Sequence, residues 1–309
     1  PQAVSRLEKF ASYALVVAYV ISIAYYLNLF GAFAVSLTPF NSPAYARIVT
    51  TAALAFVAVF GWLRGFSALE RIEEGTVGLK LSIIAGLLVG LIAFSIERAC
   101  GDGLYFSQTS LFDWQSVAVA LGLVITVQGF ETSRYLGSEF DAETRIRTMR
   151  VAQWTSAAIY LLYIGLTTFC FSNDEISNSE TAIIGMTQLV APVLPAMLVA
   201  AALAAQFSAA VADTGGCGGL AEEVTQKRIR ARVAYLLIGV LGISLTWVAN
   251  IYSIIAYASR AFAVYYALQC VIAAMFAAKS SDSGRVRVAS YLTLALFAVA
   301  IVVFGKTAE

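Results

Sequence analysis

The sequence predicts an all-α polytopic membrane protein with about nine transmembrane helices, and three observations lead to this fold class. Of the 309 residues, 60% are hydrophobic and 13% are charged, with a mean hydropathy of +0.80, whereas a soluble domain has about half apolar and a quarter charged residues. The apolar residues form runs of about 20, the length that a helix needs to cross a hydrocarbon core of about 30 Å. Alternating barrel-type strands are not seen. A soluble globular protein is therefore excluded.

Each apolar run is expected to be a helix, because a segment in lipid must satisfy its backbone hydrogen bonds internally. The segments between the runs carry most of the basic residues and separate one span from the next. Windows of about 19 residues delimit nine spans, in chain order residues 10–35, 45–66, 77–97, 115–137, 150–171, 182–212, 232–249, 251–278 and 287–305.

The basic residues alternate between the two ends of these spans. Fifteen of the twenty Lys and Arg residues fall on one side, namely Arg6, Lys9, Arg64, Arg71, Arg134, Arg145, Arg147, Arg150, Lys227, Arg228, Arg230, Arg232, Lys279, Arg285 and Arg287. The other side holds Arg47, Arg98 and Lys306, and its loop 172–180 has acidic but no basic residues. Because basic loops stay in the cytoplasm, we expect a plasma (inner) membrane protein with cytoplasmic loops 61–76, 138–149, 222–232 and 279–287.

Lys80 falls inside the third apolar window. A charge at that depth is costly and usually faces a partner or a water-filled cavity. The alternative is a purely structural role, in which the lysine extends from the first turns of the helix to the cytoplasmic headgroups. We keep Lys80 as a candidate for ion coupling.

The fourth span contains a polar interruption about fourteen residues after Gln115. Gly129, Phe130 and Glu131 follow Gln128 near the expected midplane of the membrane. A glycine beside an acidic residue is typical of a broken helix whose unwound backbone meets a substrate or ion. The alternative is a glycine at a tight helix crossing, with Glu131 close to the interface. Residues 128–131 are the main candidates for substrate binding.

The sixth span carries three polar candidates for an ion site. Gln206 and Asp213 are seven residues apart and share a helical face, whereas Ser208 and Asp213 are about 140° apart around the helix. A single ion is therefore shared more easily by Gln206 and Asp213. Asp213 is expected either to pair with Lys80 or to bind a cation directly.

Arg260 lies about ten residues into the eighth span, where it needs an anion. Ser253, Tyr257 and Arg260 occupy one face at spacings of four and three. The partner of Arg260 is expected to be Glu131, Asp213 or a substrate carboxylate, and a purely structural ion pair is the alternative.

The fourth span and the loop after it resemble the sixth helix and following loop of the amino acid, polyamine and organocation (APC) transporter superfamily. The family pattern runs Gly-Phe-Glu, then an acidic pair, then a basic stretch. The first part is matched by residues 129–131, and the second is approximated by Glu139, Arg145 and Arg147. The sequence departs from the pattern at Glu139, Phe140 and Asp141, which replace the adjacent acidic pair, and in lacking the usual prolines.

The resemblance implies that the nine spans are the third to eleventh helices of a LeuT-type fold, which has two five-helix repeats of inverted topology. Residues 1–309 would then form a single transporter domain. Within it, residues 10–97 would complete the first repeat, 115–278 would form the second and 287–305 an accessory helix. Two further helices, one of them broken, are expected upstream of Pro1.

The resemblance also implies roles for individual residues. Tyr25 or Tyr26 would cover the substrate, although an interfacial aromatic belt would place tyrosines there too. Lys80 would take the place that sodium occupies in sodium-coupled relatives and exchange a proton. Tyr257 would line the pathway and Arg260 would help to gate it. The sixth span would contribute Gln206, Ser208 and Asp213 to the ion site.

The expected function is a secondary active transporter (permease) that moves an amino acid or related small amine by alternating access, coupled to a cation, with the proton preferred. A sodium-coupled transporter of another small organic solute and, less favoured, a channel are the alternatives. An enzyme is not expected, since the chain has no His and no HExxH or GxSxG pattern. No metal or organic cofactor is expected, and the net charge of +1 indicates no nucleic-acid surface. The expected partners are the substrate and the lipid bilayer.

Overall fold

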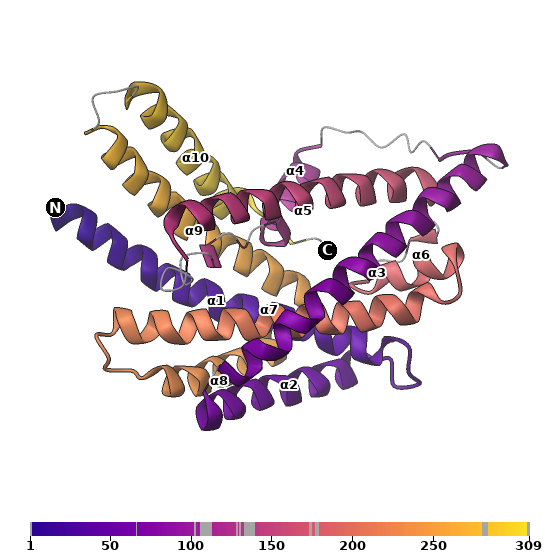
Figure 1. Ribbon diagram of the computed structural model, residues 1–309, viewed down its shortest axis with the longest axis horizontal. Coiled ribbons are helices and arrows are strands. Elements are labelled where there is room, and N and C mark those ends of the chain that lie inside the picture. The colour runs from indigo at the N-terminus through magenta and orange to yellow at the C-terminus, as the bar shows by residue number, and fades with distance from the viewer. Residues whose placement is uncertain are drawn as a thin grey trace.

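The all-α prediction is confirmed, since every regular element of the described residues is a helix (Figure 1). The computed structural model describes residues 2–65, 67–101, 103–105, 113–127, 129, 131–132, 140–172, 175–176, 179–279 and 284–307. The helices are α1 (Gln2–Ser36), α2 (Pro43–Arg64), α3 (Ser67–Cys100), α4 (Trp114–Gly122), α5 (Ala142–Cys170), α6 (Ala182–Val190), α7 (Leu194–Val224), α8 (Ala231–Val248), α9 (Ile251–Ala277) and α10 (Gly284–Phe304), with a short 3₁₀ helix, η1 (Val124–Val127).

The described residues include seven helices that are long and apolar enough to cross a membrane. They lie within α1, α2, α3, α7, α8, α9 and α10. The two other predicted spans differ from these seven. Span 115–137 is interrupted after α4, and span 150–171 lies in α5, where Gln153, Ser156 and Thr167 are among the polar residues that dilute the apolar run.

The prediction of one span over residues 182–212 is wrong, because two helices share this segment. α6 ends at Val190 and α7 begins at Leu194. Ala191 has extended backbone angles, as expected of a residue that precedes a proline, here Pro192. Pro195 lies in the first turn of α7, where its missing N–H costs no helical hydrogen bond.

Local capping explains where other helices begin. Asp141 accepts a hydrogen bond from the Thr144 N–H at 2.7 Å at the start of α5, and this bond holds the pKa of Asp141 below its usual range. Asn250 accepts one from the Ser253 N–H at 2.7 Å at the start of α9. Each cap satisfies a backbone donor that lacks a helical acceptor.

α1 is the central helix of the bundle. It packs most extensively against α7 and α9, and it also contacts α2 and α8. Its side chains Leu15, Tyr19, Ile23 and Leu27 are fully buried, and the Tyr19 ring meets Phe262 of α9 edge-on at 5.9 Å between centroids. The main core therefore surrounds α1.

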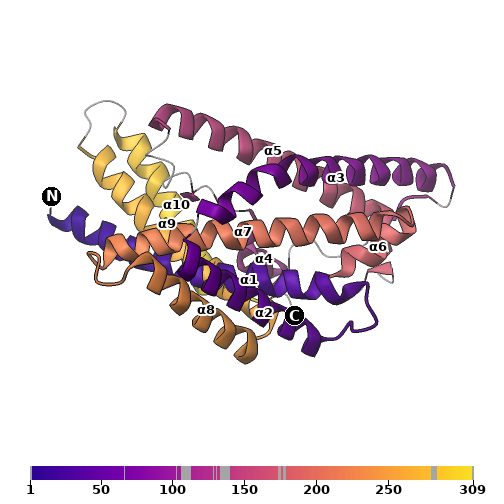
Figure 2. The same cartoon turned by 60° about the horizontal axis from the view of Figure 1, so that its bottom comes forward.

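A second apolar cluster joins α3 to α5, α6 and α7. It contains Leu87, Leu91, Cys170, Phe171, Met186 and Leu194. Figure 2 shows α3 and α5 on one side of α7, with α2 and α8 on the other. Because the described part of α5 packs mainly on α3, one face of α5 remains free to border a cavity.

An ion pair ties the C-terminal end of α3 to the loop that follows α5. Arg98 Nη2 lies 2.8 Å from Glu175 Oε1, and Arg98 Nη1 donates to the Tyr105 hydroxyl at 2.7 Å. Glu175 Oε2 accepts from the Ser172 N–H at 2.8 Å. The Ser172 N–H and the Arg98 guanidinium together lower the pKa of Glu175.

Glu175→Gln is expected to lower the free energy of unfolding by about 1 kcal/mol at neutral pH. The folded-state pKa of Glu175 lies below the unfolded value of about 4.3. The stabilisation is therefore present above that pH and is lost as the pH falls through the folded-state pKa. Thermal unfolding in detergent at pH 7 and in acid checks this. A difference between variant and wild type that is equally large in acid would contradict it.

Candidate substrate and ion-coupling site

The chain leaves the helix earlier than the sequence predicts. α4 ends at Gly122, η1 follows, and Gly129 has a φ of +139°, a conformation that glycine adopts far more readily than other residues. Two freed backbone groups are bound by side chains. The Ile125 N–H donates to Ser259 Oγ of α9 at 3.0 Å, and the Thr126 C=O accepts from the Tyr160 hydroxyl of α5 at 3.0 Å. Irregular backbone in a membrane protein is tolerated where such partners exist.

Gly122, the last residue of α4, must be glycine for a steric reason that sequence reasoning missed. A Cβ at this position would lie 1.8 Å from the Lys306 carbonyl oxygen. The Lys306 N–H also donates to the Ala118 C=O at 2.8 Å. The segment after α10 therefore packs directly on the backbone of α4.

Glu131 is a buried carboxylate in the interrupted segment. It is 6% exposed, and Glu131 Oε2 accepts a hydrogen bond from the Tyr266 hydroxyl of α9 at 2.9 Å. The Tyr266 ring stacks on Phe262 with 6.1 Å between centroids, which fixes its direction. Gln128 and Phe130, which the sequence also predicts in the substrate site, lie outside the described residues.

Asp213 is a second buried carboxylate, on α7. It is 6% exposed and accepts a hydrogen bond from Ser22 Oγ of α1, which is fully buried. One turn after Ser22, the Tyr26 hydroxyl lies within electrostatic range of both Asp213 and Glu131. The Tyr25 and Tyr26 rings are 5.1 Å apart. The fold thus places Tyr26, one of the two predicted tyrosines of α1, near both predicted acidic groups.

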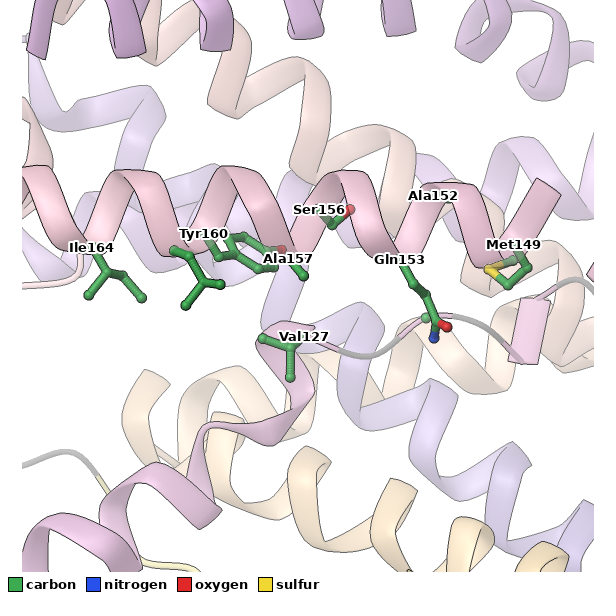
Figure 3. Close-up of a pocket in the computed structure, with 10 residues that line it drawn as sticks. Val127, Met149, Ala152, Gln153, Ser156, Ala157, Tyr160 and Ile164 are labelled. Atoms are coloured by element: carbon green, nitrogen blue, oxygen red, sulfur yellow. The ribbon is translucent and has the colours of Figure 1, made fainter. Parts of the chain in front are cut away.

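A cavity of about 670 Å³ borders the interrupted segment, a size that is typical of small-molecule sites. Figure 3 shows residues of one α5 face beside the segment that carries Val127. Its polar groups on α5 come from Gln153, Ser156 and Tyr160, and the other lining residues are Val127, Gly129, Met149, Ala152, Ala157, Leu161 and Ile164. Sequence reasoning missed this face, although the spacing of its three polar residues places them on one side of a helix.

The ion-coupling candidates are only partly brought together. Gln206, Ser208 and Asp213 all lie on α7, where Ser208 is buried and Gln206 is half-buried. Lys80 lies half-buried on α3. Within the described part of the chain, no ion pair or hydrogen bond joins Lys80 to Asp213, whereas Ser22 donates a hydrogen bond to Asp213. Their direct pairing, one of the two expected roles of Asp213, is not made.

Arg260 has a partner that the sequence analysis did not predict. Its Nη2 donates to the Gly305 C=O at 2.5 Å, just beyond the end of α10. A cation there interacts favourably with the negative end of the helix dipole. The expected anionic partner, Glu131 or Asp213, is therefore replaced by a backbone carbonyl in this structure. Tyr257, one turn earlier on α9, is 45% exposed, whereas Glu131 and Asp213 are buried.

Comparison with known proteins agrees with this architecture. A family model described as APC superfamily transporter matches residues 1–305, which include the interrupted segment and both buried carboxylates. An uncharacterized protein of Aquifex aeolicus (strain VF5) is 40% identical over 303 residues, which cover 98% of this chain and 73% of that relative. The chain therefore belongs to the APC superfamily of transporters.

Proposed function

We propose that the protein is a secondary active transporter that moves an amino acid or related small amine by alternating access, with a proton as the coupling ion. The observation that carries this proposal is the buried Glu131, which lies two residues after Gly129 in a segment that borders a cavity of about 670 Å³. The two inverted repeats, with residues 10–97 in the first and 115–278 in the second, belong to the proposal, as do accessory helix 287–305 and an inner-membrane location with the basic loops in the cytoplasm.

The chemistry of the site suits an ammonium group. A carboxylate in a low-dielectric site attracts a cation strongly, and the Tyr266 hydroxyl orients Glu131. The backbone from η1 to Gly129 adds peptide groups near the same cavity. Gln128 and Phe130 complete the proposed substrate segment, Tyr25 and Tyr26 cover it from α1, and Tyr257 lines the pathway that Arg260 gates. Lys80, Gln206, Ser208 and Asp213 are the proposed groups for ion coupling.

Uptake by proteoliposomes tests the proposal. The protein is reconstituted and given a mixture of radiolabelled amino acids, with di- and polyamines as a second mixture, in sodium-free buffer. We expect saturable uptake that an inward pH gradient stimulates, and counterflow when the vesicles are preloaded with unlabelled solute. Both are expected because an alternating-access site binds one solute at a time and faces one side at a time.

Two outcomes would contradict this proposal. Ohmic single-channel currents without saturation would indicate a channel, and uptake that depends strictly on sodium would indicate the sodium-coupled alternative. Protein-free vesicles prepared from the same lipid are the control for leakage.

A further inference from the structure

Ser22 of the central helix α1 and Asp213 of α7 connect α1 to the helix that it contacts most extensively. They are 191 residues apart in the sequence, and both are more than nine-tenths buried. A titratable group at such a contact is costly to bury. Its chemistry therefore needs an explanation beyond packing.

Ser22, a hydrogen-bond partner of Asp213, is compatible with both protonation states of its carboxyl group. A hydroxyl group donates to a carboxylate, and it accepts from a protonated carboxyl. Ser22 can therefore keep its hydrogen bond with Asp213 whether or not the carboxyl carries a proton, simply by rotating its hydroxyl hydrogen.

Several other titratable side chains lie on the helices around Asp213, and two of them are also near Glu131 of the proposed substrate site. On α1, Tyr26 lies within electrostatic range of Asp213 and Glu131. On α9, the Tyr266 hydroxyl donates a hydrogen bond to Glu131. Cys217 lies one turn beyond Asp213 on α7, within electrostatic range of its carboxyl group. On α8, Tyr235 packs against Gly218 of α7. α6 has no titratable residue in its sequence, and Lys80 of α3 forms no ion pair with Asp213.

From this arrangement we infer that Asp213 is the proton-carrying group of the transport cycle, and that Ser22 and Tyr26 link it to Glu131. One proton from the water on one side binds a carboxyl oxygen of Asp213, while Ser22 changes from donor to acceptor. The same proton leaves to the water on the other side after the change of access. Tyr26 lies one turn after Ser22 on the same face of α1 and is near both carboxylates, so the change in charge at Asp213 acts on the group that meets the substrate.

Infrared difference spectroscopy of the purified full chain during a pH titration tests the proton site without any substrate. We expect a protonated-carboxyl band in the wild type and the loss of one component of it in Asp213→Asn. The matched control is Asp113→Asn, which removes an exposed aspartate whose side chain makes no capping hydrogen bond. A protonated-carboxyl band that is unchanged in Asp213→Asn would overturn the inference.

Ser22→Ala provides a second test if Asp213→Asn does not fold. It keeps the carboxyl group but removes its hydroxyl partner. Because the hydrogen bond to the charged carboxylate is the stronger of the two, the component should persist with its midpoint moved to higher pH. An unshifted midpoint would show that Ser22 does not follow the protonation of Asp213, and would overturn the proposed link.

The role of Asp213 in transport rests on the proposed function. A second measurement therefore distinguishes failure of the proposed function from failure of the proton site. In proteoliposomes with radiolabelled amino acids, the ratio of uptake with and without an inward pH gradient should fall to about one in Asp213→Asn and stay at the wild-type value in Asp113→Asn. Absence of uptake by the wild type, with the infrared component present, would refute the proposed function and leave the proton site standing. Full pH stimulation in Asp213→Asn would overturn the proton-carrying role.

Discussion

Replacement of Glu131 by glutamine is expected to raise the apparent Kd for the transported amine about 10- to 100-fold. The substitution removes the negative charge that binds the ammonium group. Glu131 is 6% exposed, and at such a buried position the attraction between opposite charges is strong. A hydrogen bond to a charged group contributes about 1.5–3 kcal/mol, and each 1.4 kcal/mol changes an affinity about tenfold. Glutamine keeps the shape of the side chain and can still accept from the Tyr266 hydroxyl, so the fold should persist. Concentration-dependent uptake and calorimetric binding measure the change.

Glu143→Gln is the matched control for this prediction. Glu143 is exposed in the first turn of α5, whereas Glu131 is buried and accepts a hydrogen bond from Tyr266. Its substitution should leave the apparent Kd within experimental error. If Glu131→Gln bound the amine as tightly as Glu143→Gln does, Glu131 would not be the group that meets the ammonium.

The second large effect is expected at the contact between α1 and α2. Gly31→Ala should lower the free energy of unfolding by about 2–3 kcal/mol, in the range for overpacking a tight contact. A Cβ at Gly31 would lie 2.2 Å from Thr50 Oγ1 and 2.4 Å from the Ala46 carbonyl oxygen. Because the second atom is backbone, the two helices must separate. The 2.9 Å hydrogen bond from Thr50 Oγ1 to the Leu27 C=O would then be strained. Thermal or denaturant unfolding in detergent measures this loss.

Gly165→Ala is the control for the Gly31 prediction. Gly165 lies inside α5, and a Cβ there meets no atom within 4 Å. The same substitution should therefore raise the free energy of unfolding by about 0.5–1 kcal/mol, because alanine loses less backbone entropy in a helix than glycine does. Equal effects at Gly31 and Gly165 would show that the close approach of α1 and α2 does not limit stability.

The sequence alone predicted the properties that depend on local composition. The apolar runs predicted the long helices because lipid requires internally satisfied backbone hydrogen bonds, and the starts of α2, α8 and α9 agree within two residues. The cluster at Gly129 and Glu131 predicted an interrupted helix. Its extent was not predicted, because the helix already ends at Gly122, where the backbone of Lys306 approaches.

Other features depended on signals that were present but weaker than the apolar pattern. Pro192 divides span 182–212 into α6 and α7, since the residue before a proline is excluded from the helical region. The spacing of Gln153, Ser156 and Tyr160 on α5 marked a polar face. That this face borders the cavity is known only from the tertiary structure.

By itself, the sequence determined that the protein is helical, embedded in a membrane and supplied with a few costly polar groups at membrane depth. These properties follow from the hydropathy and the hydrophobic periodicity of short segments, which do not depend on contacts with other helices. Only the tertiary structure decided which groups meet: Ser22 with Asp213, Tyr266 with Glu131, and Arg260 with the Gly305 carbonyl. Such pairs depend on how each helix is rotated against its neighbours, and that rotation is set by the packing of all the side chains at the contact.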